Sequence, residues 1–184
     1  MTIEPLAPPA GASEMADLIA LLRDSVDHGA SVGFLPPLSE AAARAWWETA
    51  LAEATGGERV ILVARDSAGI TGCVHLALPG KPNAAHRAEV QKLLVHTRAR
   101  RHGLGEALMR AIEAVAAARG RTLLVLDTRE GDDAQRLYRR LGYSEAGIIP
   151  GYALDADGSA RGSIFFYRDL ASSLASRRAS SGPS

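Results

Sequence analysis

Residues 87–105 read RAEVQKLLVHTRARRHGLG and join an apolar strand to the start of a long amphipathic helix. The strand is expected to run from Arg87 to Val95, and a Gly-x-Gly turn follows it at the helix start. Such a turn points several backbone N–H groups outward, and the positive end of the helix dipole adds to their effect. Arg100 and Arg101 stand beside the turn. The arrangement suits a pyrophosphate, because donors and positive charge converge on one spot.

The residues after the turn exclude two other phosphate-binding loops. A Walker loop needs Gly-Lys-Ser/Thr for its lysine and its magnesium ligand, and no such triplet follows Gly105. The dinucleotide pattern Gly-x-Gly-x-x-Gly fails because Leu108 stands at its last position. A purely structural turn is the remaining alternative. The strand before the turn and the two arginines favour a ligand over it.

Hydrophobic patterns on both sides of this stretch predict a mixed α/β sheet. In chain order, the expected elements are an entry strand or loop at 1–12, helices at 13–29, 39–57, 103–119 and 132–141, and strands at 60–64, 70–78, 87–95, 123–126, 143–149 and 162–170. No internal repeat or linker is visible, so residues 1–170 are expected to form one domain. Residues 171–184, rich in Ser and Ala, lack an apolar face and are expected to be a disordered tail.

Particular residues are expected to define these elements. Ser13 with Asp17 is predicted to cap the first helix, and Ser39 the second. In the third helix, Glu113 is expected on the polar side, opposite the apolar stripe. The continuous apolar run at 123–126 is typical of a strand that is covered on both faces.

Composition excludes several classes of function. The 184 residues include 21 basic and 21 acidic ones, so the chain lacks the basic surplus of nucleic-acid-binding proteins. No apolar run is long enough to span a membrane. A single cysteine, Cys73, excludes an internal disulfide and suits the cytoplasm, and the five histidines show no metal-ligand spacing. We expect a cytoplasmic monomer or homodimer without metal, nucleic-acid partner or membrane contact.

The spacing Arg-x-x-Gly-x-Gly between a strand and a helix resembles the acetyl-CoA signature of the GNAT superfamily of N-acetyltransferases. This resemblance implies the GNAT fold, an α/β (α+β) architecture. Its central, twisted sheet is mixed but mostly antiparallel, with about six to seven strands flanked by about four helices. It also implies that the strand ending at Val95 splays from the next one, so that the pantetheine arm bonds to its main chain. The implied acetyl-CoA contacts are Leu93, Leu94, Val95, Arg100, Arg101, His102, Gly103, Leu104, Gly105, Glu106 and Tyr138.

Two carboxylates are candidate catalytic bases. Strand alternation places four residues on one face: Glu89, Gln91, Leu93 and Val95. Asp127 stands at the end of the next apolar strand, where α/β sheets usually carry reactive groups. Transfer of an acetyl group to an amine requires that a base remove a proton. The alternatives are a solvated Glu89 at the strand start and an Asp127 that caps a turn through Thr128.

Tyr138 is the third candidate catalytic residue. Ala134, Leu137 and Leu141 mark the expected buried stripe of its helix, with Tyr138 beside it. Simple amphipathic packing would explain a phenol there. In the GNAT superfamily, a tyrosine at this helix position lies next to the CoA sulfur and can protonate the departing thiolate.

Within the superfamily, the chain looks most like the tabtoxin-resistance acetyltransferases. The matching segments are HGASVGF (28–34), KPN (81–83), RAEVQKL (87–93), LDT (126–128), LGY (141–143), PGY (150–152) and IFFY (164–167). In that subgroup the acceptor is a β-lactam amino acid toxin. The loop at 29–34, with Trp46 or Trp47, is a candidate wall of the acceptor pocket.

We therefore expect an acyl-CoA N-acyltransferase that moves the acetyl group of acetyl-CoA directly to a primary amine of a small molecule, such as a toxin related to tabtoxinine-β-lactam. No covalent acetyl-enzyme is expected, because Cys73 is poorly placed for attack. A protein N-terminal or lysine acetyltransferase and a non-catalytic CoA-binding module are the alternatives.

Overall fold

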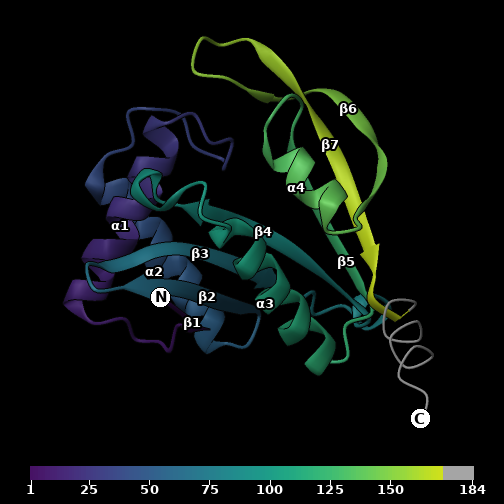
Figure 1. Ribbon diagram of the computed structural model, residues 1–184, viewed down its shortest axis with the longest axis horizontal. Coiled ribbons are helices and arrows are strands. Elements are labelled where there is room, and N and C mark those ends of the chain that lie inside the picture. Colours follow the sequence, from purple (N-terminus) through teal and green to yellow (C-terminus); the bar gives the residue numbers. More distant parts are fainter. Residues whose placement is uncertain (172–184) are drawn as a thin grey trace.

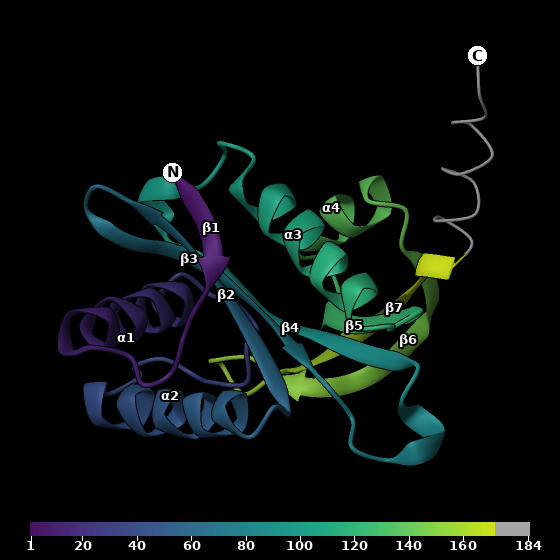
Figure 2. The same ribbon diagram turned by 90° about the horizontal axis from the view of Figure 1, so that it is seen from below.

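The computed structural model describes residues 1–171 and shows one seven-stranded sheet between two layers of helices (Figures 1 and 2). The strands are β1 (Thr2–Pro5), β2 (Arg59–Asp66), β3 (Gly69–Ala77), β4 (Arg87–Val95), β5 (Leu123–Arg129), β6 (Ser144–Leu154) and β7 (Ala160–Asp169). The helices are α1 (Ala12–Asp27), α2 (Glu40–Thr55), α3 (Leu104–Ala118) and α4 (Ala134–Arg140), with short 3-10 turns at Pro82–Ala84 and Thr97–Ala99. The expected tail at 171–184 lies outside the described residues, apart from Ala171.

The strands are ordered β1-β2-β3-β4-β5-β7-β6. Among the described residues, β4 and β5 form the single parallel pair, and every other neighbouring pair is antiparallel. The predicted mixed, mostly antiparallel sheet with four flanking helices is therefore confirmed.

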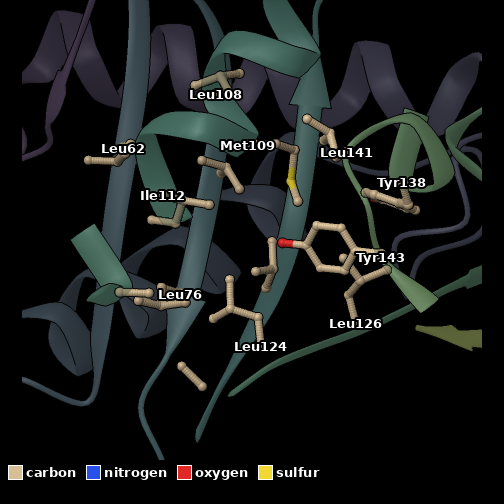
Figure 3. Packing of buried hydrophobic residues seen from close by; sticks show 14 of the residues in the cluster. Leu62, Leu76, Leu108, Met109, Ile112, Leu124, Leu126, Tyr138, Leu141 and Tyr143 are labelled. Atoms are coloured by element: carbon tan, nitrogen blue, oxygen red, sulfur yellow. The ribbon is translucent and has the colours of Figure 1, made fainter. Parts of the chain in front are cut away.

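Helices cover both faces of the sheet, and each face has its own apolar core. Helices α1 and α2 lie on one face, and α3 and α4 lie on the other (Figure 2). The α3-side cluster includes Leu108, Met109 and Ile112, all fully buried against the sheet (Figure 3). The α1/α2-side cluster includes Leu18 and Trp47. Burial of each such side chain contributes about 1.5–3 kcal/mol, so the sheet is held from both sides.

A β-bulge at Lys92 reverses the facing of β4. Lys92 has φ = 50°, which is uncommon for a non-glycine residue, and the pairing of β4 with β3 shifts register nearby. Ala88 and Val90 belong to the α3-side cluster, whereas Leu94 belongs to the α1/α2-side cluster. The prediction that one face carries Glu89, Gln91, Leu93 and Val95 is therefore wrong, since Leu93 and Val95 pack on the α3 side.

Strands β4 and β5 pair only at their first three residues. Arg87–Glu89 pairs with Leu123–Val125, and the strands then continue without pairing, spreading apart in Figure 1. The splay that the resemblance implied is present. Leu123 and Val125 of the paired segment are only half-buried, so the prediction of a strand covered on both faces is wrong.

Several local expectations are corrected. Helix α1 begins after Gly11, whose N–H donates to the Glu14 carboxylate at 2.9 Å, so Ser13 is not its cap. Asp17 instead accepts from the Ile70 N–H at 3.0 Å and ties the β2–β3 hairpin to α1. Helix α2 is capped as predicted, because Ser39 accepts from the Ala42 N–H.

The polar side of α3 and the buried side of α4 also differ from expectation. Glu113 is buried and pairs with Arg168 at 3.0 Å, so the neighbouring strand β7 replaces water as its partner. In α4, Tyr138 lies on the buried stripe, while Leu137 is only half-buried. Strand β6 extends to Leu154, beyond the expected end at 149.

Candidate active site

The start of α3 presents free backbone donors. Gly103, with φ = 77°, precedes the helix, and the first backbone bond into it runs from the Ala107 N–H to the Gly103 carbonyl at 3.0 Å. The amides at 104–106 therefore have no partner within the helix. Arg101 also adopts a positive φ, of 66°, so two left-handed residues shape the turn. The local geometry is that of an anion-binding helix start.

A cavity of about 610 Å³ opens in front of this turn, between the end of β4, the start of α3 and α4. The predicted cofactor residues that line it are Leu93, Leu94, Val95, Arg100, Arg101, Gly103, Leu104, Gly105 and Glu106. His102 and Tyr138 do not line it. Arg140 of α4 does, and the sequence reasoning missed it. Its position in the last turn of a short helix carried no signal of its own.

The residues of this cavity fit acetyl-CoA. A diphosphate would meet the free amides at 104–106 and the guanidiniums of Arg100, Arg101 and Arg140. Arg100 also donates to the Val95 carbonyl at 3.1 Å, which holds the turn against the strand. On its other side from β3, the Leu93–Val95 segment has no strand paired with it, and this open edge offers hydrogen bonds to an amide-containing arm.

A second cavity, of about 370 Å³, adjoins the first and brings the three predicted catalytic residues together. Glu89 of β4, Asp127 of β5 and Tyr138 of α4 all line it. The residues that line both cavities are Ala30, Leu93, Asp132 and Ala134. The acids and the phenol therefore lie at the inner end of the cavity that fits the cofactor.

Glu89 is held by a chain of polar side chains. The Gln91 amide donates to the Glu89 carboxylate at 2.8 Å, and the Gln91 amide oxygen accepts from Arg59 at 2.9 Å. Arg59 in turn donates to Glu53 of α2 at 2.6 Å. Glu89 is thus oriented from the protein side, unlike a residue that is merely solvated at a strand start.

Asp127 is positioned by the neighbouring strand. Its carboxylate accepts from the Ser163 hydroxyl of β7 at 2.8 Å, and both residues line the second cavity. This bond joins two strands of the sheet. It differs from the turn cap through Thr128 that was the alternative.

The aromatic ring of Tyr138 is buried. The side chain is 6% exposed, and its ring lies 5.9 Å from that of Tyr143 and 5.7 Å from that of Phe166 (Figure 3). Burial raises the pKa of Tyr138 above its usual value of 10, and Asp127 and Asp132 raise this pKa further. The phenol therefore keeps its proton at neutral pH, as a general acid must.

Lys92 is a site residue that the sequence reasoning missed. It lines the second cavity, and its ammonium donates to the Val32 carbonyl at 2.7 Å. Burial lowers the pKa of Lys92, and the charge of Arg59 acts in the same direction. The sequence did contain a signal: Lys92 stands inside an apolar strand, and it is one of only two lysines in the chain, with Lys81.

The candidate pocket wall is present only in part. The loop at 29–34 borders both cavities. Trp47 is a core residue that is 0% exposed and donates its indole N–H to the Leu18 carbonyl at 2.8 Å. Cys73 is also fully buried, and burial raises the pKa of its thiol to about 12. A protonated, buried thiol is a poor nucleophile.

Among residues 1–171, no group of three or more His, Cys, Asp or Glu side chains is arranged to hold a metal ion. None of the described helices is long and apolar enough to cross a bilayer.

Comparison with known proteins places the chain among acetyltransferases. A family model described as an acetyltransferase (GNAT) domain matches residues 57–145. A curated relative, an uncharacterized N-acetyltransferase in the hisH–hisA intergenic region of Azospirillum brasilense, is 32% identical over 119 residues. The matched residues make up 64% of this chain and 69% of the relative.

Solved structures share the fold at low identity. An N-acetyltransferase from Staphylococcus aureus Mu50 superposes with a TM-score of 0.75 at 18% identity, over 92% of this chain and 99% of that one. A ribosomal-protein-alanine N-acetyltransferase from Brucella melitensis gives 0.76 at 20%, over 92% and 100%. A putative acetyltransferase from Salmonella typhimurium, solved with its cofactor acetyl-CoA, gives 0.75 at 21%, over 92% and 94%.

Proposed function

The chain belongs to the GNAT family of acetyltransferases, and from this premise we propose that it transfers the acetyl group of acetyl-CoA directly to a primary amine of a small molecule. One observation carries the proposal. A cavity that fits the cofactor adjoins a smaller one lined by Glu89, Asp127 and Tyr138. The two meet where β4 and β5 separate.

The residues of the larger cavity would hold acetyl-CoA, which supplies the acetyl group as a thioester. The amides at 104–106, with Arg100 and Arg101, would bind the diphosphate. The edge of Leu93–Val95 that faces β5, where no strand pairs with it, would bind the pantetheine arm as an added strand does. A backbone N–H of the same segment would polarise the acetyl carbonyl.

Glu89 and Asp127 are proposed to take protons from the acceptor. An amine attacks a carbonyl only in its neutral form, so its ammonium must first lose a proton. The two carboxylates line one cavity from two different strands, and each is fixed by a hydrogen bond from a neighbouring side chain. They can therefore relay protons away from an amine placed between them.

Tyr138 is proposed to protonate the departing thiolate. The phenol is protonated at neutral pH, as it would be even without the upward shift of its pKa, and it lines the same cavity as both acids. Cys73 is buried in the α1/α2-side cluster and takes no part, so the acetyl group passes to the amine without a covalent acetyl-enzyme.

A small acceptor suits the second cavity. Its volume, about 370 Å³, is at the low end of ligand pockets. Given the subgroup resemblance of residues 28–34 and 87–93, an amino acid toxin of the tabtoxinine-β-lactam type is the first acceptor to test. A resistance role follows if that toxin is acetylated. We propose the cytoplasm as the place of action, which suits a chain with a single cysteine.

An acceptor screen tests the proposal. Thiol release from acetyl-CoA is measured over small amines, amino acids and peptides, and products are identified by the mass of one added acetyl group. Acetylation of at least one small amine is expected. Acetylation of peptides alone would contradict the small-molecule proposal. If CoA binds tightly but no compound of the panel causes thiol release from acetyl-CoA, the protein is a non-catalytic CoA-binding module.

Three variants test the assigned roles on the acceptor found. Glu89→Gln and Asp127→Asn should lower kcat by about 10²-fold or more, with unchanged CoA affinity, because a general base contributes about 10² to 10⁴. Tyr138→Phe should lower kcat similarly. Glu48→Gln and Tyr167→Phe change exposed residues and are the matched controls. Wild-type rates in the three variants would remove the roles proposed for these residues.

A further inference from the structure

The loop between α1 and α2 has few side-chain anchors of its own: Val32 and Phe34 pack against the α1/α2-side cluster, while Gly29, Ala30, Ser31 and Gly33 add little packing. Residues 29–33 read Gly-Ala-Ser-Val-Gly, and Gly29 and Gly33 have φ values of 78° and 83°. Glycines at positive φ allow tight bends but add no packing. Even so, the loop borders three clefts, including both cavities of the active site. Two cationic side chains from the sheet add to the hold on it.

Lys92 holds the middle of the loop. Its ammonium donates to the Val32 carbonyl at 2.7 Å, and a Cβ on Gly33 would lie 3.8 Å from it. The same ammonium lies 5.3 Å from the Trp46 ring centre and 6.0 Å from that of Phe34. Two aromatic faces and a carbonyl therefore surround one cation, a set of contacts that favours a protonated amine.

Arg129 holds the beginning of the loop. Its guanidinium donates to the Gly29 carbonyl at 2.9 Å and is itself fixed by Asp132, at 2.8 Å and 3.0 Å. Lys92 comes from β4 and Arg129 from β5, the two strands that separate at the active site. The loop is thus bonded through its backbone to both sides of the opening.

We propose that Lys92 is a positioning residue that pins the 29–34 loop over the acceptor end of the active site and so determines which amines fit. The inference rests on the proposed function, because it assigns the second cavity to the acceptor. With the pin in place, the loop backbone forms a wall of that cavity. Without it, the middle of the glycine-rich segment is free to move away, and the acceptor loses a contact surface. Arg129 still holds Gly29, at the end of the loop that borders the cofactor cavity.

The alternative is that Lys92 only supports the fold. Lys92→Met separates the two, because it keeps the unbranched apolar stem and removes only the charge and its hydrogen bond. Lys81→Met is the matched control, since Lys81 is the only other lysine and is exposed. Lys92→Arg retains a cation and a donor and should restore most of the wild-type behaviour.

Chymotrypsin cleavage after Phe34 measures the loop without any acceptor. Phe34 is half-buried beside Trp46, with ring centres 6.0 Å apart, so cleavage requires the loop to open. Loss of the charged hydrogen bond and the cation–π contacts should speed cleavage about tenfold in Lys92→Met, and not in Lys81→Met or Lys92→Arg. The melting temperature is measured in parallel. An unchanged cleavage rate in a folded Lys92→Met protein would overturn the proposal that Lys92 holds the loop in place.

Kinetics on the acceptor found in the screen measure the consequence. Lys92→Met should raise the KM of the acceptor about tenfold, change kcat less, and leave the KM of acetyl-CoA within about twofold. Faster cleavage with an unchanged acceptor KM would overturn the role in acceptor fit. If the wild type acetylates no amine, the proposed function fails, and with it the role in acceptor choice. The cleavage arm then still decides whether Lys92 pins the loop.

Discussion

Gly105→Ala should separate cofactor binding from stability. Gly105 is the second residue of α3, and a Cβ built there would lie 3.5 Å from a Leu137 methyl and 4.0 Å from a Val95 methyl. Both distances are ordinary van der Waals contacts, so the protein itself has room for the methyl. Alanine is the better helix former and restricts the unfolded chain, so the free energy of unfolding should rise by about 0.5–1 kcal/mol. For a chain of this size, that is about 1–4 °C in Tm.

The same methyl should weaken acetyl-CoA binding. Gly105, Val95 and Leu137 all line the larger cavity, so the added carbon narrows it between α3, β4 and α4. If the diphosphate then loses one amide bond at 104–106, the cost is about 1.5–3 kcal/mol, or about 10- to 100-fold in Kd. Calorimetric titration with CoA gives the Kd, and urea unfolding without ligand gives the stability.

Gly103→Ala provides the contrast within the same turn. No atom lies within 4 Å of a Cβ built on Gly103, but its φ of 77° is strained for alanine. This variant should therefore lose about 1–2 kcal/mol of stability. Unchanged CoA affinity in Gly105→Ala would refute the placement of the cofactor in this cavity. A loss of stability in Gly105→Ala would show that the added methyl does not fit beside Leu137 and Val95.

Two further predictions concern buried charges. Burial, then Arg59 and Lys92, lower the pKa of His75 well below 6.5, so below that pH the unfolded chain takes up a proton that the folded chain does not. As the pH is lowered below about 6.5, the free energy of unfolding should therefore decrease, by up to about 1.4 kcal/mol per pH unit. In urea unfolding, His75→Phe should show a smaller decrease per pH unit than the wild type, and an equal decrease would contradict this. Glu113→Ala leaves Arg168 buried without its carboxylate and should cost about 3–5 kcal/mol in thermal or urea unfolding, whereas the double change Glu113→Leu with Arg168→Met should cost less. A cost below about 1 kcal/mol for Glu113→Ala would show that solvent already screens Arg168.

The order and type of the elements were predictable from the sequence because they depend on local periodicity. The predicted strand at 87–95 and the helix start at Gly103 agree with β4 and α3. The Ser39 cap was predictable for the same reason, since its partner, the Ala42 N–H, lies three residues away. Interactions between residues that are close in the chain leave a pattern in the sequence, and these did.

Contacts between distant segments were not predictable. Glu113 reads as a polar-face residue of α3, yet its partner Arg168 lies 55 residues away in β7. The environment of Lys92 likewise depends on Val32, 60 residues earlier. Tyr138 was assigned beside the buried stripe because α4 is too short for its pattern to show which side faces the sheet. Each of these three residues has an environment that is created by another part of the chain.

The bulge at Lys92 links the fold to the site more directly than any single predicted residue. A bulge bends its strand and adds twist, and this one follows closely after Glu89, the last residue of β4 that pairs with β5. It therefore offers a physical reason for the separation of the two strands. It also divides β4 between the two cavities: Glu89 and Lys92, before and at the bulge, line the smaller one, Leu94 and Val95, after it, line the larger one, and Leu93 lines both. A regular strand with the same residues would place Glu89 and Leu93 on one face, as strict alternation predicts. The strand would then not change its facing between Glu89 and the main chain of Leu93–Val95. Under the proposed function, this departure from alternation is what allows one strand to contact both substrates.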